Sequence, residues 1–168
     1  MYYLGIDLGG TNIAAAVVDE NYKIIGTGKV KTNCPRPAEE IAEDMYKAGM
    51  MAVESCGLKL DDIAEVGVGA PGSVNPKDGF ICYSNNLGFV NLPLGEMLEK
   101  KFGRKVFLEN DANAAAYGEQ LAGAGKGTRQ FVAITLGTGV GGGVIINGHI
   151  LSGMNSAGGE LGHAVIVK

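Results

Sequence analysis

Two glycine-rich segments of the chain have the residue types that bind phosphate, residues 7–12 (DLGGTN) and residues 136–143 (LGTGVGGG). Glycine lets a backbone come close to a phosphate and turn its N–H groups toward the anion. In the first segment Thr11 and Asn12 add side-chain donors, and Asp7 could hold Mg²⁺ through water, because Mg²⁺ keeps much of its hydration. Taken alone, either segment could equally be an ordinary turn with a polar tip.

Each glycine-rich segment lies between two apolar runs, which is the pattern of a β-hairpin. The second segment has no Walker A lysine and is followed by a strand instead of a helix, so it is neither a P-loop nor a dinucleotide fingerprint. Two such turns at matching positions predict two hairpins that hold one polyphosphate between two domains.

A carboxylate stands at the end of an apolar strand, in Glu109-Asn110-Asp111, just before an alanine-rich helix. Asp is a favoured helix N-cap, so Asp111 could have that structural role alone. Ligands of open α/β folds bind at the carboxyl ends of strands, however, and a helix N-terminus favours an ionised carboxylate. We therefore hypothesise that Asp111 is the general base that accepts a proton from a sugar hydroxyl.

A late loop, residues 157–163, places Glu160 and His163 three positions apart among glycines. Carboxylates and imidazoles often read sugar hydroxyls, because they accept and donate hydrogen bonds. The alternative is an exposed loop with incidental polar residues, and one histidine does not make a zinc site. His149, beside Asn147-Gly148, is expected to be an exposed turn residue.

Hydrophobic spacing predicts the elements that position these residues. Three antiparallel strands open the chain and are followed by alternating helices and strands, giving the order βββαβαβα. The expected elements are strands at Tyr2–Asp7, Ile13–Val18 and within 23–31, a helix at Glu39–Cys56, a strand at Glu65–Ala70, an irregular hairpin or loop at Ser73–Tyr83, a helix at Pro93–Phe102, a strand at Val106–Glu109 and a helix at Ala112–Leu121.

A second set of strands repeats the opening pattern, which indicates an internal structural repeat. The expected strands are Gln130–Leu136, Val140–Ile146 and His149–Leu151, with a loop at Ser152–Gly162 and a strand fragment at Val165–Val167. We expect an α/β protein with one domain at 1–122 and the beginning of a second, similar domain at 129–168. The second sheet would have a bare apolar face, so the chain is expected to be part of a protein about twice as long, unless another subunit covers that face.

Composition excludes several classes of protein. Of the 168 residues 46% are hydrophobic and 19% charged, as in a soluble globular protein, and the net charge of −4 argues against a nucleic-acid-binding surface. The N-terminus lacks the basic and apolar regions of a signal peptide, and no apolar run is long enough to suggest a membrane span. The three unpatterned cysteines favour a cytoplasmic protein.

In combination and order, six motifs make the whole chain resemble the ROK family (repressor, open reading frame, kinase), and within it the bacterial glucokinases. They are GIDLGGTN at 5–12, GAPGSV at 69–74, NNLGF at 85–89, ENDANAAAYGE at 109–119, LGTGVGGG at 136–143 and GGELGH at 158–163. The resemblance implies an actin-like ATPase (ribonuclease H-like) fold of two domains, with sugar and ATP in the cleft.

The resemblance also implies roles for individual residues. Asp111 matches the catalytic base, and the sugar-binding set matches Asn110, Glu160 and His163, with Gly72 and Asn86 as further contacts. The phosphate hairpins match Gly9, Gly10, Thr11, Asn12, Thr138 and Gly139. In many members the matching histidine also ligates a structural zinc with three cysteines downstream, which would lie beyond Lys168, so zinc is expected only in the full-length protein.

The expected reaction is the Mg²⁺-dependent transfer of phosphate from ATP to glucose, giving glucose 6-phosphate, in a cytoplasmic homo-oligomer such as a dimer. Three alternatives stay open: a kinase for fructose, allose or N-acetylmannosamine, a sugar-sensing repressor, and a non-catalytic sugar-binding module. A repressor of the family would carry a helix-turn-helix before the first hairpin, for which residues 1–6 leave no room. No nucleic-acid or membrane partner is expected.

Overall fold

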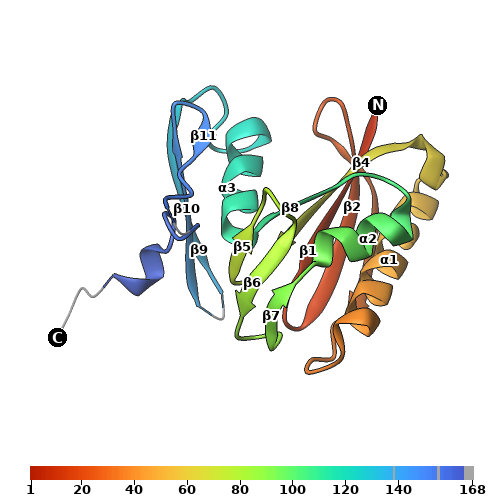
Figure 1. The fold of residues 1–168 in the computed structure, drawn as a ribbon. Coiled ribbons are helices and arrows are strands. Elements are labelled where there is room, and N and C mark those ends of the chain that lie inside the picture. Colours follow the sequence, from red (N-terminus) through yellow and green to blue (C-terminus); the bar gives the residue numbers. More distant parts are fainter. Residues whose placement is uncertain (138, 155, 165–168) are drawn as a thin grey trace. The chain divides into compact units, whose positions relative to one another are not determined.

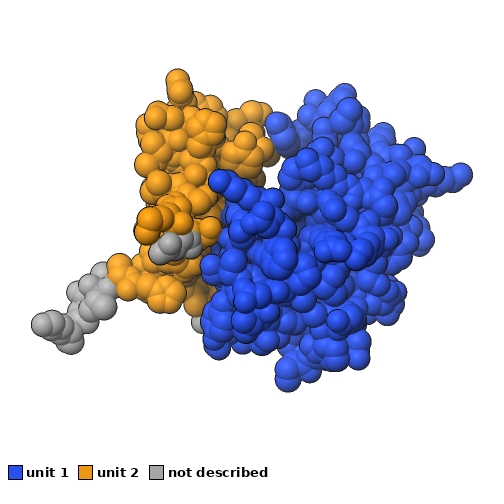
Figure 2. Space-filling view, viewed as in Figure 1, with its two compact units in different colours: residues 1–111 blue, residues 112–168 orange. Residues whose placement is uncertain are grey.

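The structure is a computed structural model that describes residues 1–137, 139–154 and 156–164. Contacts within the chain divide it into two compact units, residues 1–111 and residues 112–168 (Figure 2). Among the described residues, the first unit contains two hydrogen-bonded β-sheets and the second contains one.

The first unit is built on a mixed five-stranded sheet with the strand order β3-β2-β1-β4-β8 (Figure 1). Neighbours among β1, β2 and β3 are antiparallel, whereas β4 and β8 run parallel to β1. The carboxyl ends of β1, β4 and β8 therefore lie at one edge of the sheet, where open α/β sheets bind ligands. The strands are β1 (Tyr2–Leu8), β2 (Asn12–Asp19), β3 (Ile24–Lys31), β4 (Ile63–Ala70) and β8 (Val106–Asn110).

Two helices, α1 (Ala38–Ser55) and α2 (Leu94–Phe102), pack on this sheet and on each other. The buried positions of α1 recur every three or four residues, as in Met45, Ala48 and Ala52, so one face of the helix lies on the strands. Phe102 of α2 joins this core, with its ring centroid 5.0 Å from that of Tyr46. A short 3₁₀ turn, η1 (Leu60–Asp62), leads into β4.

A small antiparallel sheet with the order β5-β6-β7 stands between β4 and α2 in the chain. Its strands are β5 (Ser73–Asn75), β6 (Phe80–Ser84) and β7 (Phe89–Leu92). The turn between β5 and β6 is closed by a hydrogen bond from the Gly79 N–H to the Asn75 carbonyl. Ile81, Leu87 and Phe89 are buried and attach this sheet to the core of the first unit.

The second unit consists of the helix α3 (Asp111–Ala122), which begins at the last residue of the first unit, and a three-stranded antiparallel sheet with the order β11-β10-β9. Its strands are β9 (Gln130–Leu136), β10 (Val140–Ile146) and β11 (His149–Ile150). Helix α3 packs on β10, because a Cβ on Gly143 would meet Ala116. A 3₁₀ turn, η2 (Leu161–His163), follows the loop after β11.

Each helix and strand predicted up to residue 151 is present, and the segment predicted as an irregular hairpin or loop contains β5 and β6. Strand β7 was not predicted. The strand fragment expected at 165–167 lies outside the described residues. The contacts within the chain place α3 in the second unit, whereas the sequence placed this helix in the first domain. The domain boundary expected after residue 122 stays a prediction. Within the described part of the chain, no helix combines the length and the apolar character needed to cross a bilayer.

Candidate active site

The first glycine-rich segment is a hairpin turn between β1 and β2. The Gly9 N–H donates to the Asn12 carbonyl at 3.0 Å, and the last strand pair before the turn is Leu8 with Ile13. Thr11 and Gly10 are exposed at its tip. The hairpin turn predicted from the sequence is therefore present at the carboxyl end of β1 with an exposed tip, and phosphate binding by this turn stays a prediction.

Asp7 lies on β1 just before this turn, paired with Gly69 of the parallel strand β4. Partial burial, and secondly the negative charge of Asp111, raise the pKa of the Asp7 carboxyl above its ordinary value. The second contribution reflects repulsion between the two carboxylates. Such a pair favours a bound cation, which would relieve the repulsion.

Asp111 is the first residue of α3 and directly follows β8. It is exposed, although it carries interactions with its surroundings. Its position at the carboxyl end of a parallel strand and at a helix N-terminus is the one expected from the sequence. A helix N-terminus attracts negative charge, and ligands of open α/β sheets bind at the carboxyl ends of the strands.

Asn110 and Gly72 are joined by a hydrogen bond. The Asn110 side-chain amide Nδ2 donates to the Gly72 carbonyl at 3.0 Å, across the neighbouring ends of β8 and β4. Gly72 has a φ of 100°, and a Cβ there would collide with the Tyr83 carbonyl, so only glycine fits. The structure thus brings together two residues that are 38 positions apart in the sequence.

Asn86 stands in the loop between β6 and β7 and is exposed. Its Cβ lies 4.0 Å from the place where a Cβ on Gly10 would stand, so the loop touches the tip of the first hairpin. Beside it, the hydroxyl of Ser84 is buried without a hydrogen-bond partner among the described residues. The first unit therefore gathers Asp7, the hairpin, Gly72, Asn86, Asn110 and Asp111 around one edge of its sheets.

The second glycine-rich segment is the turn between β9 and β10. The Gly137 N–H donates to the Gly139 carbonyl at 2.9 Å, which closes the turn. The sequence also assigned Thr138 to this hairpin, but that residue lies outside the described residues.

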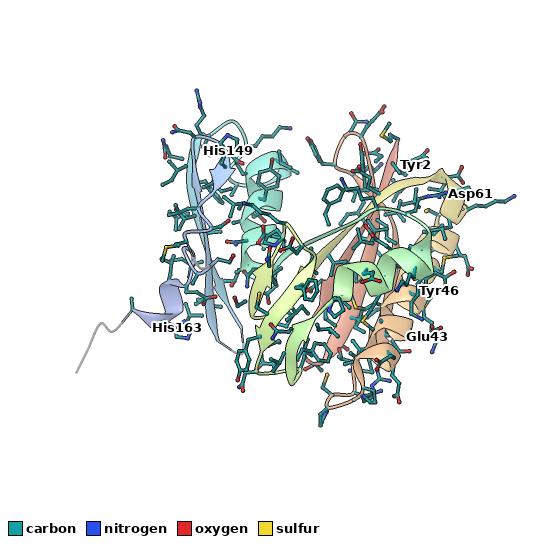
Figure 3. All side chains as sticks on the ribbon, in the orientation of Figure 1. Tyr2, Glu43, Tyr46, Asp61, His149 and His163 are labelled. Atoms are coloured by element: carbon teal, nitrogen blue, oxygen red, sulfur yellow. The ribbon has the colours of Figure 1, made fainter. Side chains whose placement is uncertain are left out.

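Glu160 and His163 are neighbours on the loop that ends in η2. His163 Nδ1 lies 3.3 Å from Glu160 Oε2, and both side chains are exposed. Leu161 holds this loop against β10, because it lies where a Cβ on Gly142 would stand. Figure 3 shows that His149 lies at the opposite end of the second unit from His163. No group of three metal-ligating side chains occurs among the described residues, so nothing in them completes a zinc site around His163.

Two polar residues beside these segments were missed by the sequence reasoning. Thr32 is fully buried and bonds to the first hairpin, and Asn113 of α3 is buried with its Oδ1 near Gly159. The sequence pattern could have pointed to Thr32, because this residue continues the alternation in which Gly26, Gly28 and Val30 face inward along β3. A polar residue at an inward position needs a hydrogen-bond partner, which marks it for closer attention.

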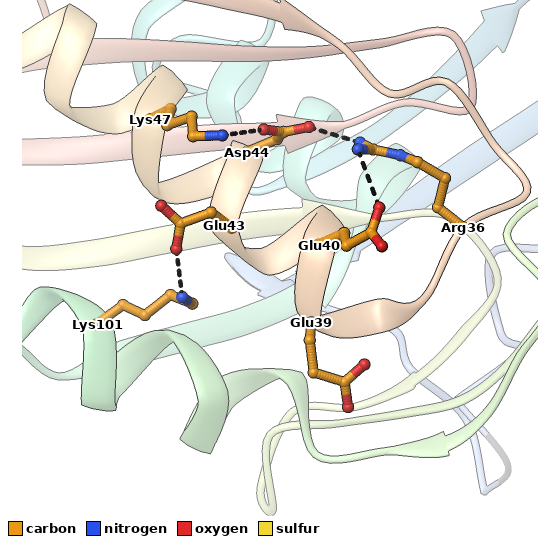
Figure 4. A pocket seen from close by; sticks show the side chains of 7 residues that line it. All are labelled: Arg36, Glu39, Glu40, Glu43, Asp44, Lys47 and Lys101. Carbon is orange, nitrogen blue, oxygen red and sulfur yellow. Dashed lines mark hydrogen bonds and ion pairs between the residues drawn. The ribbon is translucent and has the colours of Figure 1, made fainter.

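A hollow of about 330 Å³ beside the N-terminal part of α1 is a separate feature (Figure 4). It is lined by charged residues, and most of these are paired with one another. The pairs are Arg36 with Asp44 and Glu40, Lys47 with Asp44, and Lys101 with Glu43. Because the cations already have carboxylate partners, the hollow is not a ready-made anion site.

The mixed sheet of the first unit, with its helices, makes this an α/β protein, and its match to a solved ROK structure places it in the actin-like ATPase fold. The chain belongs to the ROK family, whose model matches residues 3–168. Its fold matches that of a ROK family glucokinase from Streptomyces griseus, solved in complex with glucose and AMPPNP. The TM-score is 0.89 at 41% identity, with 99% of this chain and 51% of that one covered.

Two curated relatives carry the names of kinases for different sugars. The chain is 41% identical over 167 residues to the glucokinase of Thermotoga maritima, covering 97% of this chain and 50% of that protein. It is 36% identical over 163 residues to the N-acetyl-D-glucosamine kinase of Photobacterium profundum, covering 97% of this chain and 52% of that protein. The chain spans about half the length of the curated relatives it matches.

Proposed function

We propose that the protein containing this chain transfers the terminal phosphate of ATP to glucose. The observation that carries the proposal is the edge of the first sheet, where Asp7 and Asp111 stand at the carboxyl ends of β1 and β8 beside an exposed glycine hairpin. Phosphoryl transfer requires mainly positioning and charge stabilisation, which a hairpin, a cation and an aligned carboxylate supply.

The first hairpin would bind the phosphates of ATP with its backbone N–H groups and with the side chains of Thr11 and Asn12. Asp7 would hold Mg²⁺ through water. The residues fit this ion, because Mg²⁺ is usually bound by one or two carboxylates together with water and substrate phosphate. When bound, Mg²⁺ neutralises charge that develops on the transferred phosphoryl group.

Asp111 would accept the proton of the sugar hydroxyl as that oxygen attacks phosphorus. Asn110 would bind the sugar, and its bond to the Gly72 carbonyl fixes the direction of its amide. Asn86 would supply a further contact. From the second unit, we propose that Glu160 and His163 bind sugar hydroxyls and that Thr138 and Gly139 bind phosphate. The resemblance and the sequence support the roles of Glu160, His163, Thr138 and Gly139, and also a structural zinc, a dimeric state and a cytoplasmic location.

The proposal is tested by assaying the protein, at the full length its gene encodes, with ATP and glucose. Asp111→Asn should lower kcat by about a hundredfold or more, because a positioned general base contributes that much, while the melting temperature stays nearly unchanged. Asp78→Asn, at the exposed turn between β5 and β6, is the matched control and should retain full activity. Ordinary turnover by Asp111→Asn would show that this residue is not the base.

A second candidate is a kinase for a related hexose, favoured by the similarity to an N-acetyl-D-glucosamine kinase. Comparing kcat/KM for glucose, N-acetylglucosamine, N-acetylmannosamine, fructose and allose decides between these substrates. A preference for glucose over the N-acetylated sugars supports the first candidate. If another sugar has a higher kcat/KM, that sugar replaces glucose as the proposed substrate, and the assigned residue roles are then tested with it.

A further inference from the structure

Thr32, directly after β3, makes two hydrogen bonds to the first hairpin. Its hydroxyl Oγ1 donates to the Gly9 carbonyl at 2.6 Å, and its backbone N–H donates to the Thr11 carbonyl at 3.0 Å. The residue has no exposed surface. Burying a hydroxyl is costly unless it forms a hydrogen bond, so the bond to Gly9 is what makes a threonine acceptable at this position.

The bond to Gly9 sets the direction of a neighbouring N–H group. In a planar trans peptide the carbonyl and the N–H point in opposite directions. The Gly9 carbonyl points toward Thr32, so the Gly10 N–H points away from it. Between two glycines the peptide plane can rotate at low cost, and the hydroxyl of Thr32 removes that freedom.

Thr32 is itself held by the first helix. Arg36 donates from Nε to the Thr32 carbonyl at 2.9 Å and from Nη2 to Asp44 of α1 at 2.6 Å, and Lys47 also bonds to Asp44 (Figure 4). Burial acts to raise the pKa of Asp44, but the bonds from Arg36 and Lys47 outweigh it, so that the pKa lies below its usual value. Asp44 of α1 is thus an ionised partner that holds Arg36 in place, and Arg36 in turn binds the Thr32 carbonyl.

We propose that Thr32 is a positioning residue for the nucleotide: it fixes the hairpin so that the Gly10 N–H can donate to a phosphate of ATP. The inference rests on the proposed function, since it assigns the hairpin to the phosphates. Thr32 acts through the hairpin and does not itself touch the nucleotide. A positioning role predicts an effect on ATP and not on the sugar.

The test compares Thr32→Val, which keeps the shape and removes the hydroxyl, with Thr32→Ser, which keeps the hydroxyl. In the full-length protein, Thr32→Val should lower kcat/KM for ATP by about tenfold or more, because small displacements of positioning groups have effects of this size. The KM for the sugar should change less than about twofold, as expected when one substrate's contacts are left intact. Thr32→Ser should restore most of the loss. Thr27→Val, on the exposed side of β3, is the control and should behave as wild type.

Nucleotide binding without sugar gives a readout apart from turnover. Calorimetry should show weaker binding of the non-hydrolysable analogue AMPPNP with Mg²⁺ to Thr32→Val than to Thr32→Ser. If the valine variant does not fold, Arg36→Gln tests the same support from its other end and should raise the KM for ATP selectively.

The outcomes separate the two proposals. A wild-type protein that neither binds nucleotide nor phosphorylates any hexose overturns the proposed function, and the role of Thr32 falls with it. If the wild type is active and Thr32→Val has an unchanged KM for ATP, the role of Thr32 alone is overturned. Where the valine variant is unfolded, an unchanged KM for ATP in Arg36→Gln has the same meaning. Equal losses for ATP and sugar in the folded variant would show a general structural role and would also overturn it.

Discussion

Strands β1–β3 of the first unit and β9–β11 of the second follow the same plan and differ in what covers them. In both sheets the second strand lies between the first and the third. In β1, Leu4, Ile6 and Leu8 are 1%, 3% and 0% exposed. Their counterparts in β9, counted back from each glycine turn, are Val132, Ile134 and Leu136, with 55%, 62% and 82% of their surface exposed.

The helices account for this difference, because they pack on opposite faces of the two sheets. Helix α1 covers the face of the first sheet that carries Leu4 and Leu8. Helix α3 covers the other face of the second sheet, where Gly141 and Gly143 allow its backbone to come close. On the face of the second sheet that carries Ile134, Leu161 lies against β10. The alternation of apolar residues thus specifies a strand, while its burial depends on which helix the chain supplies.

The largest effect should come from truncating equivalent side chains in the two sheets. Leu4→Ala should lower the free energy of unfolding by about 2–5 kcal/mol, because it leaves a cavity in a packed core. Ile134→Ala should cost less than about 1 kcal/mol, because its side chain is largely exposed. Urea unfolding of the 168-residue chain, followed by circular dichroism, measures both. Equal losses would mean that the face of β9 is covered in solution, which would end the contrast between the sheets.

The two glycine turns offer a smaller contrast. A Cβ on Gly9 would stand 2.8 Å from the Asn12 carbonyl oxygen, whereas on Gly137 it would meet no described atom within 4 Å. Gly9→Ala should therefore destabilise the chain by about 1–3 kcal/mol, the usual range for forced overpacking. Gly137→Ala should stay within about 0.5 kcal/mol of wild type, as at open surface sites. Thermal unfolding of the pair checks this. A larger loss at Gly137 would show that the second turn is the tighter of the two.

The sequence contained enough to predict the long helices and most strands of both units, because alternation and helical spacing record which residues face a core. It also placed Asp7, Asn110 and Asp111 at strand ends, and parallel pairing then brings those ends to one edge. Strand β7 was missed because its four residues carry no clear alternation, with only Phe89 buried. The bonds of Thr32 to Gly9 and of Asn110 to Gly72 join distant parts of the chain, and local patterns do not record such partners.

The smallest expected effect concerns charge, since the position of Asp7 in the first hairpin is held by the neutral Thr135 in the second. Burial, and then the charge of Asp111, raise the pKa of Asp7 in the folded chain. At pH values between the ordinary pKa and this raised pKa, the folded chain therefore binds more protons than the unfolded chain. Stability is then lost as pH rises through that window. Asp7→Asn should accordingly stabilise the chain slightly at neutral pH, and the gain should vanish at a pH below the ordinary value of 3.8.

Asp19, at the other end of β2, gives a control of opposite sign. Hydrogen bonding, led by the backbone N–H of Lys23, lowers the pKa of this carboxyl, so its contribution is present at neutral pH and is lost as pH falls. Asp19→Asn should destabilise the chain slightly at neutral pH. Urea unfolding at several pH values compares both variants with wild type. If Asp7→Asn instead lowers stability at neutral pH, the charge of Asp7 does not destabilise the first hairpin. That result would mean that the charge difference between the two hairpins does not affect the stability of the chain.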